Sequence, residues 1–532
     1  MLSPVFRPTV QLYDTTLRDG TQREGISLSV ADKVKIAREL DRAGIGYIEA
    51  GWPGSNPKDA EVFRQLAANP LAQARLAAFG STRRAGVAAE ADANLRALID
   101  ARTPVVTLVG KSSVVHVEQI LETTREENLA MIRDSVAWCT AQDREVIYDA
   151  EHWFDGFHAD PEYALATLRA AADAGANRLV LCDTNGGTLP DAVAASVRAV
   201  RAVLPDVPLG IHAHNDCGLG VANALAAVAA GCTQVQGTVN GYGERCGNAD
   251  LLVIAATLQL KLGRSCVPPG ALARFAALSA FVADVAGLPP DDHAPYVGRS
   301  AFAHKGGLHA AAVAKIPASY QHIDPAVVGN SPHMVVSELA GRASVRLSAT
   351  ALGLPLDGAD AEVLQRVKEL EARGYQFEGA AGSFEMLLRR TRPGYEPPFV
   401  PIDFTIVTEQ RGGGALRAQA IVKLRIDGAV THTAAEGAGP VNALDRALRT
   451  ALLPRYPDLA DVQLVDYRVR IVDEHLGTAA RPRVLIESTR GSGHGEDRWR
   501  TVGCSEDIIE ASWLALIDSL ELPLARLKDS RA

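Results

Sequence analysis

Short apolar, β-branched runs alternate with longer stretches of helical periodicity over roughly the first half of the chain. Each run is followed by a loop and by a stretch that can form a helix. The predicted strands are Val10–Asp14, Tyr47–Ala50, Leu76–Gly80, Val105–Val109, Val146–Ala150, Arg178–Cys182, Leu209–His214 and Gln234–Val239. Eight successive strand–helix units predict a (β/α)8 barrel, the TIM barrel.

A doubly wound sheet is the other common architecture that alternates strands with helices. It would usually carry a Gly-rich phosphate-binding turn after its first strand. Residues 14–22 instead read DTTLRDGTQ. The sequence therefore favours the barrel.

Two proline-containing joints divide the remainder of the chain. Val267–Gly270 leads into segments of helical periodicity, and Arg389–Pro401 introduces strand-like text followed by helix candidates. A chain of 532 residues should form about three units. We expect a TIM-barrel domain over residues 1–265, a helical linker and lid region over residues 266–398, and a C-terminal α+β domain over residues 399–532.

The composition excludes several classes of protein. Hydrophobic residues make up 47% and charged residues 22% of the chain, which is typical of a globular protein with a large core. The net charge of −9 comes without a Lys/Arg block, so we expect no nucleic-acid partner. No apolar run approaches the length of a membrane span, and the first residues do not resemble a secretion signal, so we expect a cytoplasmic protein. The seven cysteines never form C-x-x-C, which predicts neither disulfides nor a zinc knuckle.

Side chains that can bind a metal ion or take part in catalysis gather where the predicted strands end. TIM barrels place their active sites there. Arg18 and Asp19 follow the first strand, Glu151 the fifth and Thr184 the sixth, His212 and His214 end the seventh, and Asn248 follows the eighth. His212 and His214 are two residues apart on one strand, so both imidazoles project to the same side. With Asp19 as an oxygen ligand they could hold Mn²⁺, Mg²⁺ or Zn²⁺. The alternative is that the histidines only form hydrogen bonds inside the barrel.

A divalent ion held in this way would polarise a keto oxygen. Arg18 beside it could stabilise the alkoxide that forms when carbon attacks that carbonyl. Thr184 could hold a small carboxylate, or it could be only a turn residue. Glu151 could position substrate or assist proton transfer, or it could be a solvated loop charge.

Three segments resemble one enzyme family. Leu17–Gln22 (LRDGTQ), together with Lys33, and Leu209–Gly220 (LGIHAHNDCGLG) resemble the two signatures of the 2-isopropylmalate, homocitrate and citramalate synthases. Asn240–Asn248 (NGYGERCGN) is similar to the family's glycine-rich loop after strand eight. This family belongs to a metal-dependent TIM-barrel superfamily that also contains 3-hydroxy-3-methylglutaryl-CoA lyase.

The resemblance implies that four residues ligate the metal: Asp19, His212, His214 and Asn248. It places Arg18 at the substrate keto group, and we expect Thr184 and Tyr148 to bind substrate. Phe302–Val313 resembles the family's lid, which implies a catalytic His309 with Tyr320 further along. In the family this lid commonly reaches a partner's barrel, so a homodimer is implied. Without the resemblance, His309 would be an incidental helix residue.

The C-terminal part resembles the family's regulatory domain, which binds an end-product amino acid. The resembling segments are GAGPVNALDRAL and RWRTVGCSEDIIEASW. They belong to two similar β-rich halves that each end in a helix, roughly Phe404–Leu453 and Leu464–Leu520. Lyases of the superfamily lack this extension, so the resemblance favours a synthase.

The implied reaction removes a proton from the methyl group of acetyl-CoA, adds the carbon to a 2-keto acid and hydrolyses the thioester. His309 assisted by Glu151 is the expected base, and Tyr320 would orient groups or relay a proton. Segments 12–33 and 47–59 resemble the family's citramalate synthases more than its isopropylmalate synthases. This implies pyruvate as substrate and isoleucine as feedback inhibitor. The alternatives are 2-ketoisovalerate as substrate, on the leucine pathway, and a non-catalytic amino-acid sensor. The contacts of CoA are unassigned.

Overall fold

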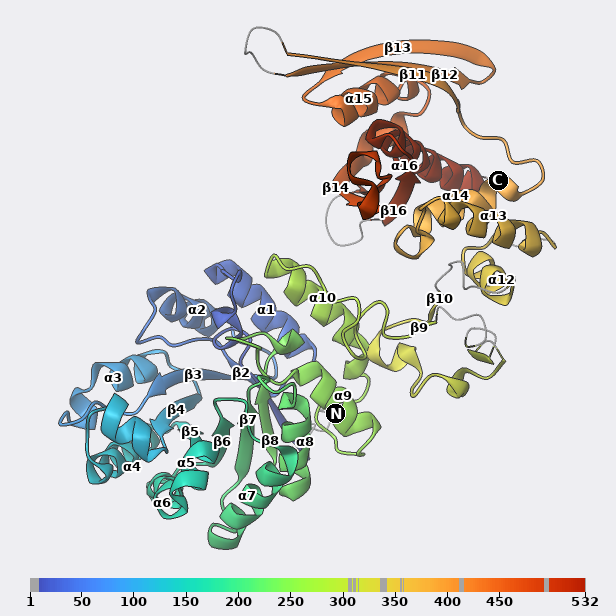
Figure 1. Cartoon of the computed structure of the whole chain (residues 1–532). Helices are drawn as coiled ribbons and strands as arrows, with labels where there is room; N and C mark the ends of the chain where they lie inside the picture. Colours follow the sequence, from blue (N-terminus) through green and yellow to red (C-terminus); the bar gives the residue numbers. More distant parts are fainter. Residues whose placement is uncertain are drawn as a thin grey trace, which may run out of the picture. The chain divides into compact units, whose positions relative to one another are not determined.

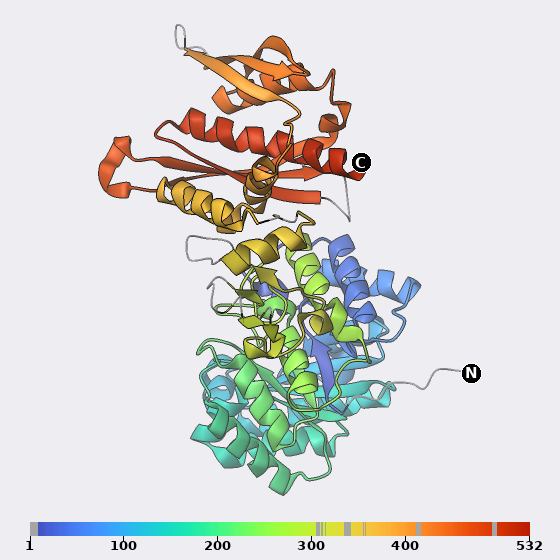
Figure 2. The same ribbon diagram turned by 90° about the vertical axis from the view of Figure 1, so that its right-hand side faces the viewer.

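The structure of the chain is a computed structural model that forms two compact units (Figures 1 and 2). The first unit comprises Met1–Phe302 and Ile323–Pro332, and the second comprises Ala303–His322 and His333–Ala532. The described residues are 9–304, 309, 312–313, 315–334, 342–354, 356, 358–410, 416–491 and 497–531. The start of the chain, on which the expectation about a secretion signal rests, lies partly outside them.

Eight parallel strands close into a barrel in the first unit, as the sequence predicts. β1 pairs with β8, with Gln11 opposite Gln234, and this pairing completes the ring. The strands are β1 (Gln11–Asp14), β2 (Tyr47–Glu49), β3 (Arg75–Ser81), β4 (Val105–Lys111), β5 (Glu145–Glu151), β6 (Arg178–Asp183), β7 (Leu209–Ala213) and β8 (Gln234–Gly237).

Helices connect the strands and cover the outside of the barrel (Figure 1). They are α1 (Val30–Arg42), α2 (Pro57–Ala68), α3 (Ala93–Asp100), α4 (Arg125–Ala141), α5 (Trp153–Ala159), α6 (Pro161–Asp173), α7 (Pro190–Val203), α8 (Gly220–Ala230) and α9 (Leu251–Leu260). Local chemistry fixes several of their starts. Ser29 and Asp32 form a capping box at α1, and Asp160 caps α6 directly before Pro161. α10 (Phe275–Val285) packs against α1 and completes the unit.

The strands present two different faces, because successive side chains point to opposite sides of a strand. One small cluster fills the barrel interior: Tyr13, Tyr47, Ala77, Val105, Ile147, Val180 and Cys182. A larger apolar layer lies between the strands and the surrounding helices. On β5 this alternation sends Ile147 and Asp149 to the interior and Tyr148 to the outer layer. Side-chain parity on each strand therefore decides which residues can reach a site inside the barrel.

The second unit begins with a pair of two-residue parallel strands, β9 (Ala303–His304) and β10 (His333–Met334). Three helices follow: α12 (Arg342–Ala351), α13 (Asp360–Ala372) and α14 (Ala381–Thr391). α14 packs against the last strand and the last helix of the chain. The expected three-part division stays a prediction, but α14 belongs by its packing with the C-terminal fold.

The C-terminal fold contains the same motif twice, three antiparallel strands and then a helix, as the two β-rich halves of the sequence predict. The first copy is β11 (Val400–Glu409), β12 (Arg417–Ile426), β13 (Ala429–Gly437) and α15 (Pro440–Leu452), and the second is β14 (Val462–Ile471), β15 (Pro482–Arg490), β16 (Asp497–Cys504) and α16 (Ile508–Arg531). Asp427 and Gly428 join β12 to β13 with φ values of 49° and 81°. Both central residues of this tight hairpin are therefore left-handed, which Asp and Gly tolerate best. One apolar cluster includes residues of both copies.

The expectations about membrane spans and disulfides can be compared with the described residues. Among the described residues no helix combines the length and the apolar character that a bilayer-spanning segment needs. All seven cysteines are free, and five of them are buried. The predicted absence of disulfides is thus what the structure shows for these residues.

A buried carboxylate holds α14 to α16, and this contact generates a stability prediction. Glu385, 3% exposed, accepts hydrogen bonds from Arg389 at 2.8 Å and from Arg526 at 2.7 Å. Removing one partner of a buried ion pair typically costs about 3–5 kcal/mol. Each arginine keeps a second carboxylate, Asp529 or Asp497, so Glu385→Ala should destabilise the second unit by about 3 kcal/mol, the lower end of that range.

Urea unfolding followed by circular dichroism would measure this loss, with the transitions of the two units fitted separately. Glu369→Ala is the matched control, because Glu369 forms an exposed i,i+3 pair with Arg366 on α13. It should leave both transitions where they are. A Glu385→Ala protein that unfolds at the same urea concentration as the parent would contradict the assignment.

Candidate active site

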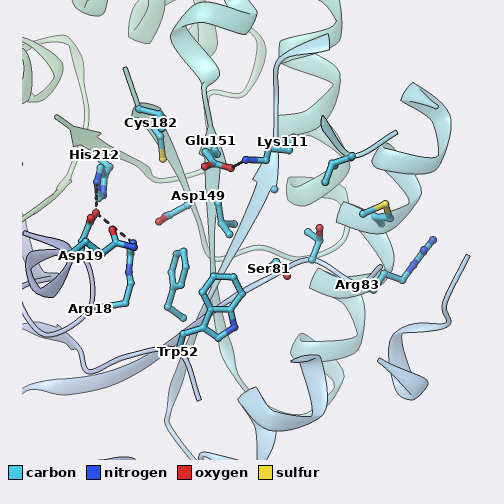
Figure 3. A pocket seen from close by; sticks show the side chains of 18 of the residues that line it. Arg18, Asp19, Trp52, Ser81, Arg83, Lys111, Asp149, Glu151, Cys182 and His212 are labelled. Atoms are coloured by element: carbon cyan, nitrogen blue, oxygen red, sulfur yellow. Dashed lines mark hydrogen bonds and ion pairs between the residues drawn. The ribbon is translucent and has the colours of Figure 1, made fainter. Parts of the chain in front are cut away.

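A cavity of about 590 Å³ opens at the carboxyl ends of the barrel strands. Its lining combines the residues that the sequence analysis singled out with others from neighbouring strands: Arg18, Asp19, Trp52, Phe79, Lys111, Asp149, Glu151, Cys182, Thr184, His212, His214 and Arg245. Figure 3 shows Arg18, Asp19 and His212 together at one end of this cavity and Arg83 at the other. The barrel thus brings residues from β1 to β8 to one site.

Asp19 faces both histidines, His212 on β7 and His214 directly after it. Its Oδ2 is 3.2 Å from Nε2 of His212 and 3.8 Å from Nε2 of His214. All three side chains are buried, and one ligand atom from each lies within 4.8 Å of the others. The two-residue spacing of the histidines therefore does place both imidazoles on the same side, facing one carboxylate.

The electrostatic surroundings keep this carboxylate ionised. Burial alone would raise the pKa of Asp19, but Arg18 and the hydrogen bonds from His212 and His214 hold it well below its usual value. Burial also disfavours a charged His212, yet Asp19 outweighs this and raises the pKa of the imidazole. A proton and a cation would therefore compete for the same place between these side chains.

The donor set fits a divalent cation. Two imidazole nitrogens and one carboxylate oxygen converge, and Asn248, 2% exposed, pairs with His214 in an isolated β-bridge. Asn248 donates its amide hydrogen to the carbonyl of Tyr242 at 3.1 Å, which leaves its buried Oδ1 without a partner among the described residues. Buried polar atoms are rarely left unpaired, so this amide oxygen has the character of a ligand atom, although Asn248 is not among the residues that line the cavity.

Arg18 is held in one plane next to this cluster. Its Nε donates to Oε1 of Glu49 at 2.6 Å, and its guanidinium lies over the ring of Phe79 at 3.8 Å from the centroid. Tyr13 donates to the other oxygen of Glu49 at 2.6 Å. Burial opposes the charge on Arg18, but Glu49 and Asp19 raise its pKa. The guanidinium is therefore a fixed cation with donors left for a substrate oxygen.

Glu151 and Thr184 both line the cavity. Glu151 is the last residue of β5, and Thr184 directly follows β6. Lys111, at the end of β4, forms an ion pair with Glu151. The Thr184 hydroxyl accepts a hydrogen bond from the backbone N–H of His152 at 2.9 Å, so its own proton is free to be donated. Both residues that the sequence predicted are thus at the site, and Glu151 has a cationic neighbour that the sequence did not reveal.

The structure does not bring Tyr148 to this cavity. Its side chain is fully buried in the layer between strands and helices, and its ring leaves no room for a side chain at Gly110, where an added Cβ would lie 2.8 Å away. Tyr148 precedes Asp149 on β5 and so has the opposite parity. The expected contact of Tyr148 with substrate does not agree with this placement.

His309 and Tyr320 lie in the second unit. Their rings stack with centroids 4.2 Å apart, and both side chains are exposed. Residues 305–308, 310 and 311 of the expected lid lie outside the described residues. The pairing of His309 with Tyr320 is thus an observation, whereas their part in catalysis stays a prediction.

Several polar residues of the site were missed by reasoning from the sequence: Glu49, Lys111, Asp149, Gln236 and Arg245. Burial and the neighbouring Glu49 raise the pKa of Asp149 to about 7, and Gln236 contacts both Asp149 and His212. Glu49, Asp149 and Gln236 share one signal, a polar residue inside a predicted strand at the parity of the barrel interior, whereas Lys111 and Arg245 lie outside the predicted strands. That signal was present for β2, β5 and β8, but it becomes visible only when the inward face is known.

The barrel, the buried Asp-His-His cluster and the fixed arginine define a TIM-barrel protein with a candidate metal site in its active-site position. Family models match three consecutive regions of the chain: HMGL-like over residues 9–282, Homocitrate synthase post-HMGL domain-like over 296–375, and LeuA allosteric (dimerisation) domain over 378–523.

Curated relatives match over almost the whole chain. An (R)-citramalate synthase of Synechocystis sp. is 50% identical over 98% of this chain and 97% of its own length, and one of Geobacter sulfurreducens is 49% identical over 98% of both. A Methanopyrus kandleri protein that carries a 2-isopropylmalate synthase name is only 32% identical over 98% of this chain. The chain belongs to the HMGL-like family, and within it to the group of the (R)-citramalate synthases.

The cluster around Asp19 generates a prediction about metal binding. His212→Ala should weaken Mn²⁺ binding by at least about 100-fold, because it removes a ligand, where loss of an outer-shell partner alone typically costs 10–100-fold. In the parent protein the affinity should fall as the pH drops through the imidazole range, since Nε2 must be free of its proton to bind the ion.

Titration of free Mn²⁺ by electron paramagnetic resonance would measure both effects. His158→Ala is the control, because His158 is an exposed imidazole on α5. Unchanged Mn²⁺ affinity in the His212→Ala protein would rule out the cluster as the metal site.

Proposed function

We propose that this chain catalyses the Claisen condensation of acetyl-CoA with pyruvate to (R)-citramalate and CoA. The observation that carries the proposal is the identity of about one half to (R)-citramalate synthases over nearly the full length of both chains. The buried cluster at the barrel mouth supports it, because an acyltransferase of this kind needs a polarised keto group beside a fixed cation.

Four side chains would hold a divalent metal ion: Asp19, His212, His214 and Asn248. Mn²⁺ or Mg²⁺ suits the mixed nitrogen and oxygen donors, and Zn²⁺ is the alternative. When bound, the ion supplies Lewis-acid polarisation of the keto oxygen.

Arg18 stabilises the negative charge that develops on the keto oxygen as the carbon–carbon bond forms. Glu49 and Phe79 fix the plane of its guanidinium before substrate arrives, so little reorganisation is needed in the transition state. Thr184 donates its free hydroxyl proton to the carboxylate of pyruvate. A lysine could not replace Arg18, because an ammonium group cannot keep the hydrogen bond to Glu49 and present a second donor in the same plane.

His309, assisted by Glu151, removes a proton from the acetyl methyl group. Tyr320 orients the reacting groups or relays the proton. The resulting carbanion bonds to the keto carbon, and the keto oxygen takes up a proton to become a hydroxyl group. Water then cleaves the thioester and releases CoA as a thiol. Lys111 holds the Glu151 carboxylate in place at the end of β5. In this mechanism residues 1–265 bind and polarise the substrate, and residues 266–398 form the lid. In a homodimer the partner's lid completes each site.

The experiment that tests the function is a comparison of keto acids. Purified protein with Mn²⁺ and acetyl-CoA should release thiol fastest, by kcat/KM, with pyruvate, and more slowly with 2-ketobutyrate, 2-ketoisovalerate and 2-ketoglutarate. Binding pockets discriminate by about 10–200-fold in kcat/KM per methylene group. The kcat/KM for pyruvate should therefore exceed that for 2-ketoisovalerate by at least the lower end of this range.

Two other outcomes have defined meanings. Preference for 2-ketoisovalerate would make the protein a 2-isopropylmalate synthase on the leucine pathway. Absence of thiol release with every keto acid would favour a non-catalytic amino-acid sensor.

We propose further that residues 399–532 bind isoleucine as the end product of the route that citramalate enters. The paired βββα motifs support this, because two similar halves packed on one core can leave a small pocket between them. Isoleucine should inhibit 5–150-fold, the range of a typical coupling free energy of about 1–3 kcal/mol, and leucine should inhibit less.

This prediction is best tested with the whole chain, since a cut near Pro398 would leave α14 without its contacts to α16 and β16. Isoleucine, leucine and valine should be titrated separately against thiol release and against the thermal unfolding of the second unit. Bound ligand stabilises the unit that holds it, so isoleucine should raise the unfolding temperature of that unit. Inhibition without such a shift would place the inhibitor elsewhere, and no inhibition by any of the three would refute the regulatory role.

A further inference from the structure

A chain of three buried side chains crosses the barrel interior behind the candidate metal site. Nδ1 of His212 lies 2.8 Å from Oε1 of Gln236, and Nε2 of Gln236 lies 2.9 Å from Oδ1 of Asp149. Asp149, Gln236 and His212 are 2%, 1% and 5% exposed. They come from β5, β8 and β7, so the chain of contacts links strands that are not all neighbours in the barrel.

The carboxylate of Asp149 determines which way the amide of Gln236 faces. An amide has a donor end and an acceptor end, and a carboxylate oxygen accepts. The opposite orientation would set two acceptor oxygens 2.9 Å apart in a buried site, which is strongly unfavourable. Oε1 of Gln236 must therefore face His212 and accept a hydrogen bond from it.

This orientation in turn selects the tautomer of His212. With Nδ1–H donating to Gln236, the proton that a cation would displace from His212 is the one on Nε2, the nitrogen that points at Asp19, and its loss leaves the lone pair there. Ligating histidines usually have such an acceptor at the second ring nitrogen, which fixes the ring and raises its basicity.

His214 lacks this arrangement. Its Nδ1 lies 2.8 Å from a guanidinium nitrogen of Arg245, and arginine can only donate. A neutral His214 then carries its proton on Nε2, the nitrogen directed at Asp19. Of the two histidines, only His212 is set in advance to offer a lone pair to a cation.

We propose that Gln236 is a positioning residue that, anchored by Asp149, prepares His212 to bind the metal. The inference rests on the metal site of the proposed function and adds to it which imidazole is preorganised and by what. Gln236 itself does not line the cavity and so acts only through His212.

The test measures the dissociation constant of Mn²⁺ for the full-length protein at a fixed, mildly alkaline pH. Gln236→Leu removes the acceptor and should weaken binding by about 10–100-fold, the usual cost of losing an outer-shell partner. The matched control is Gln234→Leu. Gln234 is a fully buried residue of the same strand and parity, and neither its Oε1 nor its Nε2 has a hydrogen-bond partner within the described part of the chain. The control should bind Mn²⁺ like the parent.

A polarity swap separates positioning from a merely structural role. In the double variant Asp149→Asn/Gln236→Glu, the new asparagine donates to the new glutamate, which still accepts from His212, and the pair keeps one negative charge. Mn²⁺ affinity should return to within about threefold of the parent, since the partner that fixes the His212 tautomer is restored. Should Gln236→Leu fail to fold, this swap alone decides the question.

Three results would overturn the proposal: parent-like Mn²⁺ affinity in Gln236→Leu, equal weakening in Gln236→Leu and Gln234→Leu, or a swap variant that binds as weakly as Gln236→Leu. A parent protein that does not bind Mn²⁺ at all would instead refute the metal site of the proposed function. The two failures are therefore distinguishable.

Discussion

The buried carboxylate of Asp19 is the charge around which the active-site end of the barrel is built. A carboxylate that is 3% exposed is stable as an ion only where cations or hydrogen-bond donors surround it. Here Arg18 and the imidazoles of His212 and His214 do so. Each of these partners is in turn held by a further side chain: Glu49 for Arg18, Gln236 for His212 and Arg245 for His214. Loss of Arg18 would leave the buried charge of Asp19 poorly compensated.

This arrangement concentrates polar groups in a place where folding alone would favour apolar ones. The lower interior of the barrel is filled by side chains such as Tyr47, Val105, Ile147 and Val180, as packing requires. Towards the carboxyl ends of the strands, Glu49 and Asp149 replace them. Burial, together with the charge of Glu49, raises the pKa of Asp149 to about 7, far from that of a solvated carboxyl group. A network of this kind lowers stability in exchange for a preorganised site, which is common where an enzyme must stabilise developing charge.

The second unit is held together mainly by apolar packing. Its two βββα copies bury a helix against each three-stranded sheet and meet in a single apolar cluster. α14 ties the preceding helical region to this fold through Glu385 and Arg526. The family model that matches residues 378–523, which include α14, is the LeuA allosteric (dimerisation) domain.

The positions of the strands and helices and the identities of the reactive residues follow from the sequence. Strand and helix periods are local properties, so the eight barrel strands and the two C-terminal halves could be located from alternation alone. The histidine pair could also be placed, because residues two apart on one strand share a side whatever surrounds them. The side to which each strand residue points, and the residues that lie opposite it, depend instead on how the whole barrel packs. This packing turned Tyr148 outwards, turned Asp149 inwards, and brought Glu49, Gln236 and Arg245 from distant parts of the chain to the groups they hold. These contacts depend on the register with which β1 closes on β8 and on packing across the barrel, and neither is encoded in the neighbourhood of any single residue.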